Sequence, residues 1–83
     1  MNPSSIQDRI YWVLYDELDC CRFEDLHLHA RLREDLGADD YDMHSLRLAL
    51  DDAFNLEISE LDMCDLDTVR KLVHYVSSRV VTA

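Results

Sequence analysis

The sequence predicts a single all-α domain: a four-helix bundle of three longer helices and one short one, with a long loop between the first two. Glycine and proline, which punctuate turn-rich β folds, occur once each in 83 residues. Three segments place apolar residues at helical spacing. A chain of this length forms one domain, residues 1–83. Such a domain buries only about 60% of its unfolded surface, so its core has to be packed efficiently.

The first predicted helix begins near Ser4 and runs to Leu18. Ser4 followed three residues later by Gln7 matches a capping box, in which the two side chains bond the free N–H groups at a helix start. Three aromatic residues lie on the flanking faces, where a ring covers core and its polar group stays in water. The apolar stripe is formed by Ile6, Ile10, Val13, Leu14 and Leu18.

Residues 19–39 show no clear period and are predicted to form the long loop. Loops of this length are uncommon in compact domains and are usually functional or characteristic of a particular fold. Four widely spaced leucines are expected to hold the loop against the bundle: Leu26, Leu28, Leu32 and Leu36.

The second predicted helix begins at Asp39, whose side chain can cap the free N–H groups. Asp42 suits the helix dipole in the first turn, and Asn55 is a suitable left-handed stop. The inward stripe is Met43, Leu46, Leu50 and Phe54, with Ala49 and Ala53 beside it.

The remaining two helices are predicted on either side of residue 66. Residues 59–65 are expected to form one short helical turn with Leu61 or Met63 facing inward. Asp67 is then expected to cap the last helix. The buried stripe of that helix is Val69, Leu72, Val73, Val76 and Val80.

The net charge of −10 restricts the partners of this domain. Non-specific binding to nucleic acid needs a basic surface, so it is excluded. The same charge repels anionic membranes and suits a protein with a basic patch. No apolar run approaches the roughly 20 residues that span a bilayer, and residues 1–5 do not begin a signal peptide. Three cysteines are too few for a disulfide scaffold, so the thiols are expected to be reduced. The chain is expected to be cytoplasmic and monomeric.

The segment Leu36-Gly37-Ala38-Asp39-Asp40-Tyr41-Asp42 resembles the Asp-Leu-Gly-Ala-Asp-Ser-Leu-Asp signature of the acyl carrier protein family. The resemblance runs from about Ser4 to Val76 with one extra residue between positions 19 and 26. It implies the four-helix fold of that family, including its long first loop. The matching positions are Ile6, Arg9, Leu18, Glu34–Asp39, Asp42, Leu46, Ala49, Leu50, Asp51, Asp52, Phe54, Glu57, Ile58, Thr68, Val69 and Tyr75.

The departures from the family pattern fall on its functional positions. Asp40 stands where the family has the serine that carries the 4′-phosphopantetheine arm, and Tyr41 replaces the leucine after it. His44 and Arg47 replace small apolar residues, and Ser45 replaces an acid. Arm transfer needs a hydroxyl oxygen that attacks a phosphorus of coenzyme A. A carboxylate is a weak nucleophile that would give a labile acyl phosphate. The resemblance thus implies the carrier fold without its attachment chemistry at position 40.

Asp40 and its acidic neighbours have two interpretations. A carboxylate at a helix N-terminus could place a permanent charge where the family has its phosphodiester. Alternatively, it only stabilises the first turn, by about 0.3–1 kcal/mol. The acids of this helix could likewise be a solvated face or, as the resemblance implies, a recognition surface for basic enzymes. The candidate partner-binding residues are Asp39, Asp40, Tyr41, Asp42, His44, Arg47, Leu48, Asp51 and Asp52.

A metal site is a weaker possibility. Cys20, Cys21, His27 and His29 carry metal-binding side chains, but zinc sites usually separate their cysteines by two to four residues. No catalytic constellation or phosphate-binding glycine loop is present, so the chain is not expected to be an enzyme.

Three hypotheses follow. The first is an interaction module without a cofactor that binds a basic protein, such as an acyl-transfer or synthase-type enzyme of fatty-acid or polyketide metabolism. The second is a genuine acyl carrier with 4′-phosphopantetheine attached unconventionally at Ser45. The third is a small metal- or redox-responsive protein.

Overall fold

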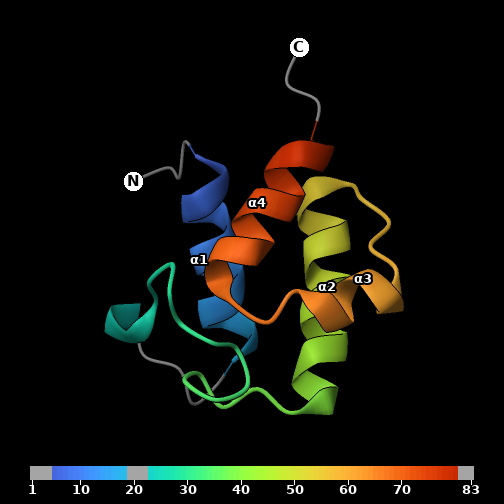
Figure 1. The fold of residues 1–83 in the computed structure, drawn as a ribbon. Coiled ribbons are helices and arrows are strands. Elements are labelled where there is room, and N and C mark those ends of the chain that lie inside the picture. The colour runs from blue at the N-terminus through green and yellow to red at the C-terminus, as the bar shows by residue number, and fades with distance from the viewer. Residues whose placement is uncertain (1–4, 19–22, 81–83) are drawn as a thin grey trace.

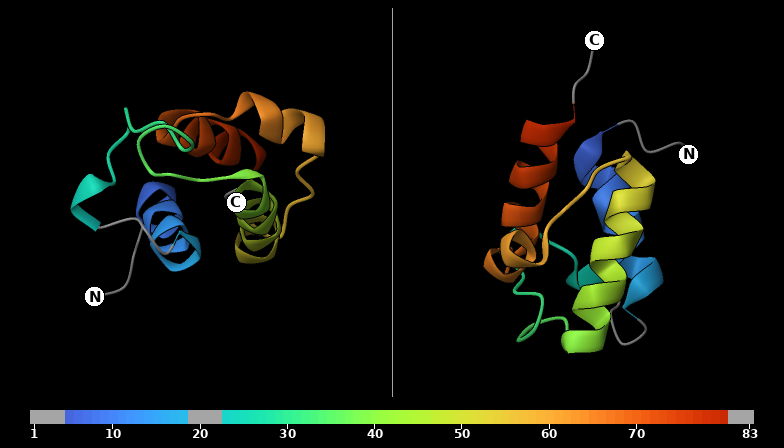
Figure 2. Two further views of the ribbon diagram at one scale, coloured as in Figure 1. Left: turned by 90° about the horizontal axis from the view of Figure 1, so that it is seen from below. Right: turned by 90° about the vertical axis from the view of Figure 1, so that its right-hand side faces the viewer.

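The computed structural model describes residues 5–18 and 23–80. Over these residues the chain forms an all-α bundle of three long helices and one short one (Figure 1), as the sequence predicts. Seen end-on, α4 lies across the pair formed by α1 and α2 (Figure 2). The elements are α1 (Ile6–Glu17), a 3₁₀ turn η1 (Phe23–Asp25), α2 (Asp40–Phe54), α3 (Glu60–Asp65) and α4 (Val69–Arg79).

The core is built from the predicted apolar stripes. The predicted inner residues of α2 are all buried, whereas the outer members of the α1 and α4 stripes are partly buried. Met63 rather than Leu61 faces inward from α3. No polar side chain is buried in the parts of the chain that the structure describes. The fully buried side chains are those of Ile10, Leu14, Leu18, Leu32, Leu46, Leu50, Val69, Leu72 and Val76.

Two of the predicted helix starts were wrong by one residue. α1 is capped by Ser5, whose hydroxyl accepts the Asp8 N–H at 3.1 Å; Ser4 lies outside the described residues. α4 is capped by Thr68, whose hydroxyl accepts the Lys71 N–H at 3.2 Å. Thr68 has the extended backbone that a capping residue needs. The neighbouring Asp67 instead forms an ion pair with the Lys71 ammonium at 2.9 Å.

The ends of α2 confirm the prediction. Asp39 and Asp42 form a reciprocal capping box at its N-terminus. Asn55 ends the helix in the left-handed region, with a φ of 55°. The recognisable signature of residues 36–42 therefore sets where α2 begins.

The long loop is held by leucines, as expected, and also by backbone bonds that the sequence did not indicate. Leu26, Leu32 and Leu36 are buried and Leu28 is partly buried. The Val69 and Arg70 N–H groups donate to loop carbonyls at 3.0 and 2.9 Å. An isolated antiparallel bridge joins Arg31 to Thr68. These bonds anchor the loop to the start of α4.

A turn at Gly37 leads the loop into α2. Its φ of 74° lies in the left-handed region, which glycine tolerates without strain. The next residue, Ala38, is buried and donates its N–H to the Leu32 carbonyl at 2.9 Å. This turn delivers Asp39 to the capping position and Asp40 to the first turn of α2. Among the described residues, no helix combines the length and the apolar character needed to cross a bilayer.

Candidate functional site

The candidate site is the N-terminal half of α2, and two of its predicted residues work within the helix itself. The Asp42 N–H donates to the Asp39 carboxylate at 2.8 Å. In return, the Asp39 N–H donates to the Asp42 carboxylate at 3.2 Å. Both carboxylates thus satisfy donors that a helix start leaves free.

Asp40 is an almost fully exposed member of the predicted site. Its side chain is 93% exposed and forms an ion pair with Arg33, whose guanidinium lies 2.7 Å away. Arg33 belongs to the long loop and was not among the predicted residues. An ion pair this exposed is worth only about 0–1 kcal/mol, so it orients the Asp40 carboxylate without removing it from water.

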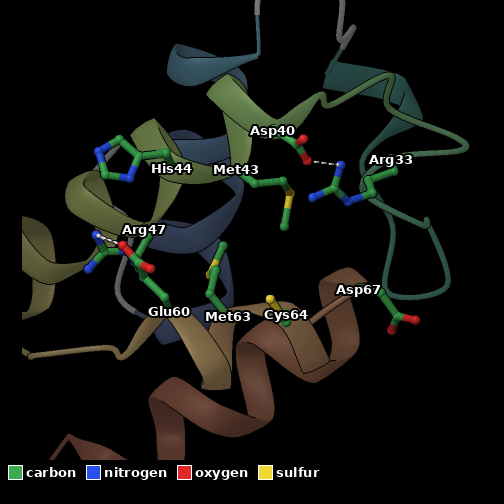
Figure 3. Close-up of a pocket in the computed structure, with 9 residues that line it drawn as sticks. All are labelled: Arg33, Asp40, Met43, His44, Arg47, Glu60, Met63, Cys64 and Asp67. Atoms are coloured by element: carbon green, nitrogen blue, oxygen red, sulfur yellow. Dashed lines mark ion pairs between the residues drawn. The ribbon is translucent and has the colours of Figure 1, made fainter.

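A pocket of about 340 Å³ lies beside Asp40, between α2 and α3 (Figure 3). The thioethers of Met43 and Met63 and the thiol of Cys64 provide its apolar part. Its other lining residues are charged or polar: Arg33, Asp40, His44, Arg47, Glu60 and Asp67. The Lys71 ammonium hydrogen-bonds the carboxyl group of Asp67 and lowers its pKa, so this carboxyl group stays ionised and paired with Lys71.

Arg47 and Asp51, predicted to contact a partner, are engaged inside the fold. The Arg47 guanidinium is only 16% exposed and donates to the Ile58 carbonyl at 3.1 Å. The Asp51 carboxylate accepts the Ile58 N–H at 2.8 Å. The two side chains lie 3.9 Å apart and fix the connection between α2 and α3. They are therefore not part of the freely accessible surface.

The accessible part of the predicted surface is a line along the outside of α2. Tyr41 is 76% exposed and Leu48 is 49% exposed. Ser45 is half-buried between them, and Asp52 is exposed one turn after Leu48. Spacings of three and four residues place these side chains on one helix face, with the exposed His44 at its edge. We call Tyr41, Ser45, Leu48 and Asp52 the outer line of α2.

The metal-site residues are not brought together within the described part of the chain. Cys20 and Cys21 lie outside it, and His27 and His29 are exposed on the loop. No group of three or more His, Cys, Asp or Glu side chains able to hold a metal occurs among residues 5–18 and 23–80.

Apart from Met43, which the sequence placed on the inner face of α2, the pocket residues that the sequence missed are Arg33, Glu60, Met63, Cys64 and Asp67. No local spacing relates them to α2. They meet it only because the loop and α3 fold back against that helix, so no sequence pattern could have found them.

The family model and the individual relatives that match this chain indicate the same protein family. The model of the phosphopantetheine attachment site family matches residues 17–76. Acyl carrier proteins from three strains of Buchnera aphidicola subsp. Acyrthosiphon pisum (5A, Tuc7 and APS) are each 31% identical over 75 residues. Each alignment covers 90% of this chain and 92% of the relative. With the four-helix fold and the capped Leu-Gly-Ala-Asp turn, these matches show that the chain belongs to the acyl carrier protein family.

Proposed function

We propose that this domain is a carrier-type interaction module that binds a basic partner protein through α2 and is not phosphopantetheinylated at the start of that helix. Members of its family are carriers that work with acyl-transfer and synthase-type enzymes and are not themselves catalysts. The observation that carries the proposal is the side chain at position 40. It is an exposed carboxylate, held by Arg33, in the first turn of the capped helix.

The side chains at the start of α2 do not fit covalent attachment of the arm. Asp39 and Asp42 are used for capping, and Asp40 has no hydroxyl group. The aromatic Tyr41 follows, and a phenol differs from the aliphatic hydroxyl of a serine in both reach and acidity. Asp40 supplies a permanent negative charge at a helix N-terminus, a position that favours anions.

The outer line of α2 is the proposed contact surface. Tyr41 and Leu48 give it an exposed apolar centre, and aromatic side chains are frequent anchors of interfaces. The exposed carboxylates of Asp40 and Asp52 flank that centre. Carboxylates at the edge of an interface accelerate association with a basic partner and exclude acidic ones. We therefore propose a basic, acyl-transfer or synthase-type enzyme as the partner, and a cytoplasmic, monomeric state for the free domain.

The alternative function is a genuine acyl carrier with the arm on Ser45. The family match to a phosphopantetheine attachment site supports carrier function in general and so favours this alternative. Ser45 is the only serine or threonine of α2, and it lies on the accessible outer line. The position of Ser45 counts against this alternative, because Ser45 lies inside a regular helix and away from the turn at Gly37 and Asp39.

Mass spectrometry of the intact protein separates the two functions. The native chain is incubated with coenzyme A and a promiscuous phosphopantetheinyl transferase. We expect no added mass on the native chain, and partial modification of the double variant Asp40→Ser, Tyr41→Leu. Ser45→Ala is the matched control, because it removes the alternative hydroxyl without touching position 40.

Each outcome decides between the hypotheses. A native chain that gains the arm, and a Ser45→Ala variant that does not, would establish the alternative. Modification of the double variant alone would support the proposal, because restoring the hydroxyl at position 40 is then sufficient.

A further inference from the structure

α4 differs in charge from every other helix of this domain. It carries Arg70, Lys71, His74 and Arg79 and contains no aspartate or glutamate. Each of the other helices in the described parts of the chain contains acidic residues. In a chain of net charge −10, this helix provides a basic surface.

A shallow groove of about 540 Å³ runs along α4, and no carboxylate lines it. Arg70, Lys71 and His74 line it together with the hydroxyl groups of Thr68, Tyr75 and Ser78. Guanidinium and ammonium groups are donors only. Of the hydroxyl groups, Tyr75 already donates to the Asp62 carboxylate and Ser78 to the Tyr75 carbonyl, so the donors for an anion are the basic side chains. The lining is therefore suited to anionic groups, unlike the pocket beside Asp40, which has charges of both signs.

Two of the side chains that line this groove are available to an external anion. Lys71 is engaged with Asp67 at 2.9 Å. Arg79, farther along the helix, lies 3.5 Å from the Asp62 carboxylate. The side chains of Arg70 and His74 have no ion pair or hydrogen bond with any described residue. They are exposed and lie one helical turn apart, so that one anionic segment can reach both.

Stability of the helix does not explain Arg70, whose side chain has no carboxylate partner among the described residues. Arg70 and Lys71 lie in the first turn of α4, where the helix dipole favours acidic side chains. The first turns of α1, α2 and α3 do carry acids. A local choice that opposes stability is expected where a residue serves binding.

We infer that the α4 groove is a second docking surface, which binds an acidic segment of a partner protein. From Arg70 to Ser78 the groove extends about 12 Å along the helix, which suits an extended segment with several carboxylates better than one small anion. α4 and α2 are separate long helices of the bundle, so a partner in the α4 groove contacts a different helix from a partner on the outer line of α2 (Figure 2).

The test is an NMR titration of the full ¹⁵N-labelled chain with a short, blocked oligoglutamate peptide at low ionic strength. We expect amide shifts confined to residues 68–78. Arg70→Gln should weaken binding on the order of tenfold, as expected for losing a hydrogen bond between charged groups. Arg33→Gln makes the same change in net charge at a residue that does not line the α4 groove, and it should leave the affinity unchanged.

A second variant guards against loss of folding. Arg70→Glu places an acid in the first turn of α4, where the helix dipole favours it, so α4 should remain folded while binding is abolished. Shifts spread over the surface, no binding, or equal weakening by Arg33→Gln would overturn the inference. So would peptide-independent self-association in sedimentation, with shifts on both α2 and α4. None of these results depends on whether position 40 or Ser45 can be modified.

Discussion

At the scale of single residues, several arginine side chains of this acidic domain stabilise the fold through contacts within it. The Arg9 guanidinium donates to the Ala53 carbonyl at the end of α2 and lies 4.4 Å from the centre of the Phe54 ring. Arg47 holds the Ile58 carbonyl, and Arg31 forms ion pairs with Glu34 and Asp35 within the loop. Because so many cations are used internally, the exposed carboxylates dominate the outer surface.

Arg47 is predicted to be more important for stability than Arg33. Replacing Arg47 with Met leaves the Ile58 carbonyl without its side-chain donor and removes the ion pair with Asp51, at a cost of about 1–3 kcal/mol in the free energy of unfolding. Arg33→Gln breaks only an exposed ion pair and should cost less than about 1 kcal/mol. Urea unfolding of both variants measures the difference. Equal losses would show that the Arg47 contacts contribute little.

Tyr75 is predicted to make the domain less stable as the pH rises into the alkaline range. Burial, followed by the hydrogen bond to Asp62, raises the pKa of the Tyr75 phenol. A raised pKa in the folded state means that the stabilisation is complete below the ordinary tyrosine pKa of about 10 and is lost as the pH rises through the folded-state pKa. The free energy of unfolding of the native chain should therefore fall in that range.

Tyr75→Phe removes the hydroxyl group, and with it the titration of the phenol and the hydrogen bond to Asp62. At neutral pH it should be less stable by about 1–2 kcal/mol, because the 2.8 Å hydrogen bond to the Asp62 carboxylate is lost. Its stability should then vary less with alkaline pH than that of the native chain. Tyr41→Phe, at an exposed position, serves as the control. Identical alkaline profiles for the native chain and Tyr75→Phe would contradict the assignment.

At the scale of helices, the first turn of α2 depends on its capping box. Asp39→Ala removes the acceptor of the Asp42 N–H and should lower the free energy of unfolding by about 1 kcal/mol. Asp52→Ala, on an exposed part of the same helix, changes the net charge equally and should have no such cost. Thermal unfolding followed by circular dichroism measures both. A stability loss shared by the two variants would indicate a charge effect instead of capping.

At the scale of the whole molecule, excess negative charge opposes compactness. A net charge of −10 on 83 residues creates repulsion that salt screens over about 8–10 Å at physiological ionic strength. The melting temperature should therefore rise with added sodium chloride, and rise further with a divalent cation. Neutralising Asp40 and Asp52 together should reduce this salt dependence. A melting temperature that is the same at low and high ionic strength would count against the prediction.

Within the bundle, predictions succeeded where interacting residues are close in sequence. The inner stripe of α2, its Asp39 cap and its Asn55 stop all depend on neighbours within about four positions, so a spacing pattern reveals them. The caps of α1 and α4 were each placed one residue too early. Several residues at a helix start can cap it, and the backbone conformation around Ser5 and Thr68 decides which one does.

By itself, the sequence determined the helices, the acidic character and the absence of a hydroxyl group at position 40, since these follow from residue type and local spacing. The tertiary structure alone decided that Arg33 reaches Asp40, that Arg47 is held inside, and that α4 carries an acid-free groove. Such contacts form when the loop and α3 close onto the bundle. The Arg9 bond to Ala53, for example, joins residues 44 positions apart. No local pattern records which distant side chains that closure brings together.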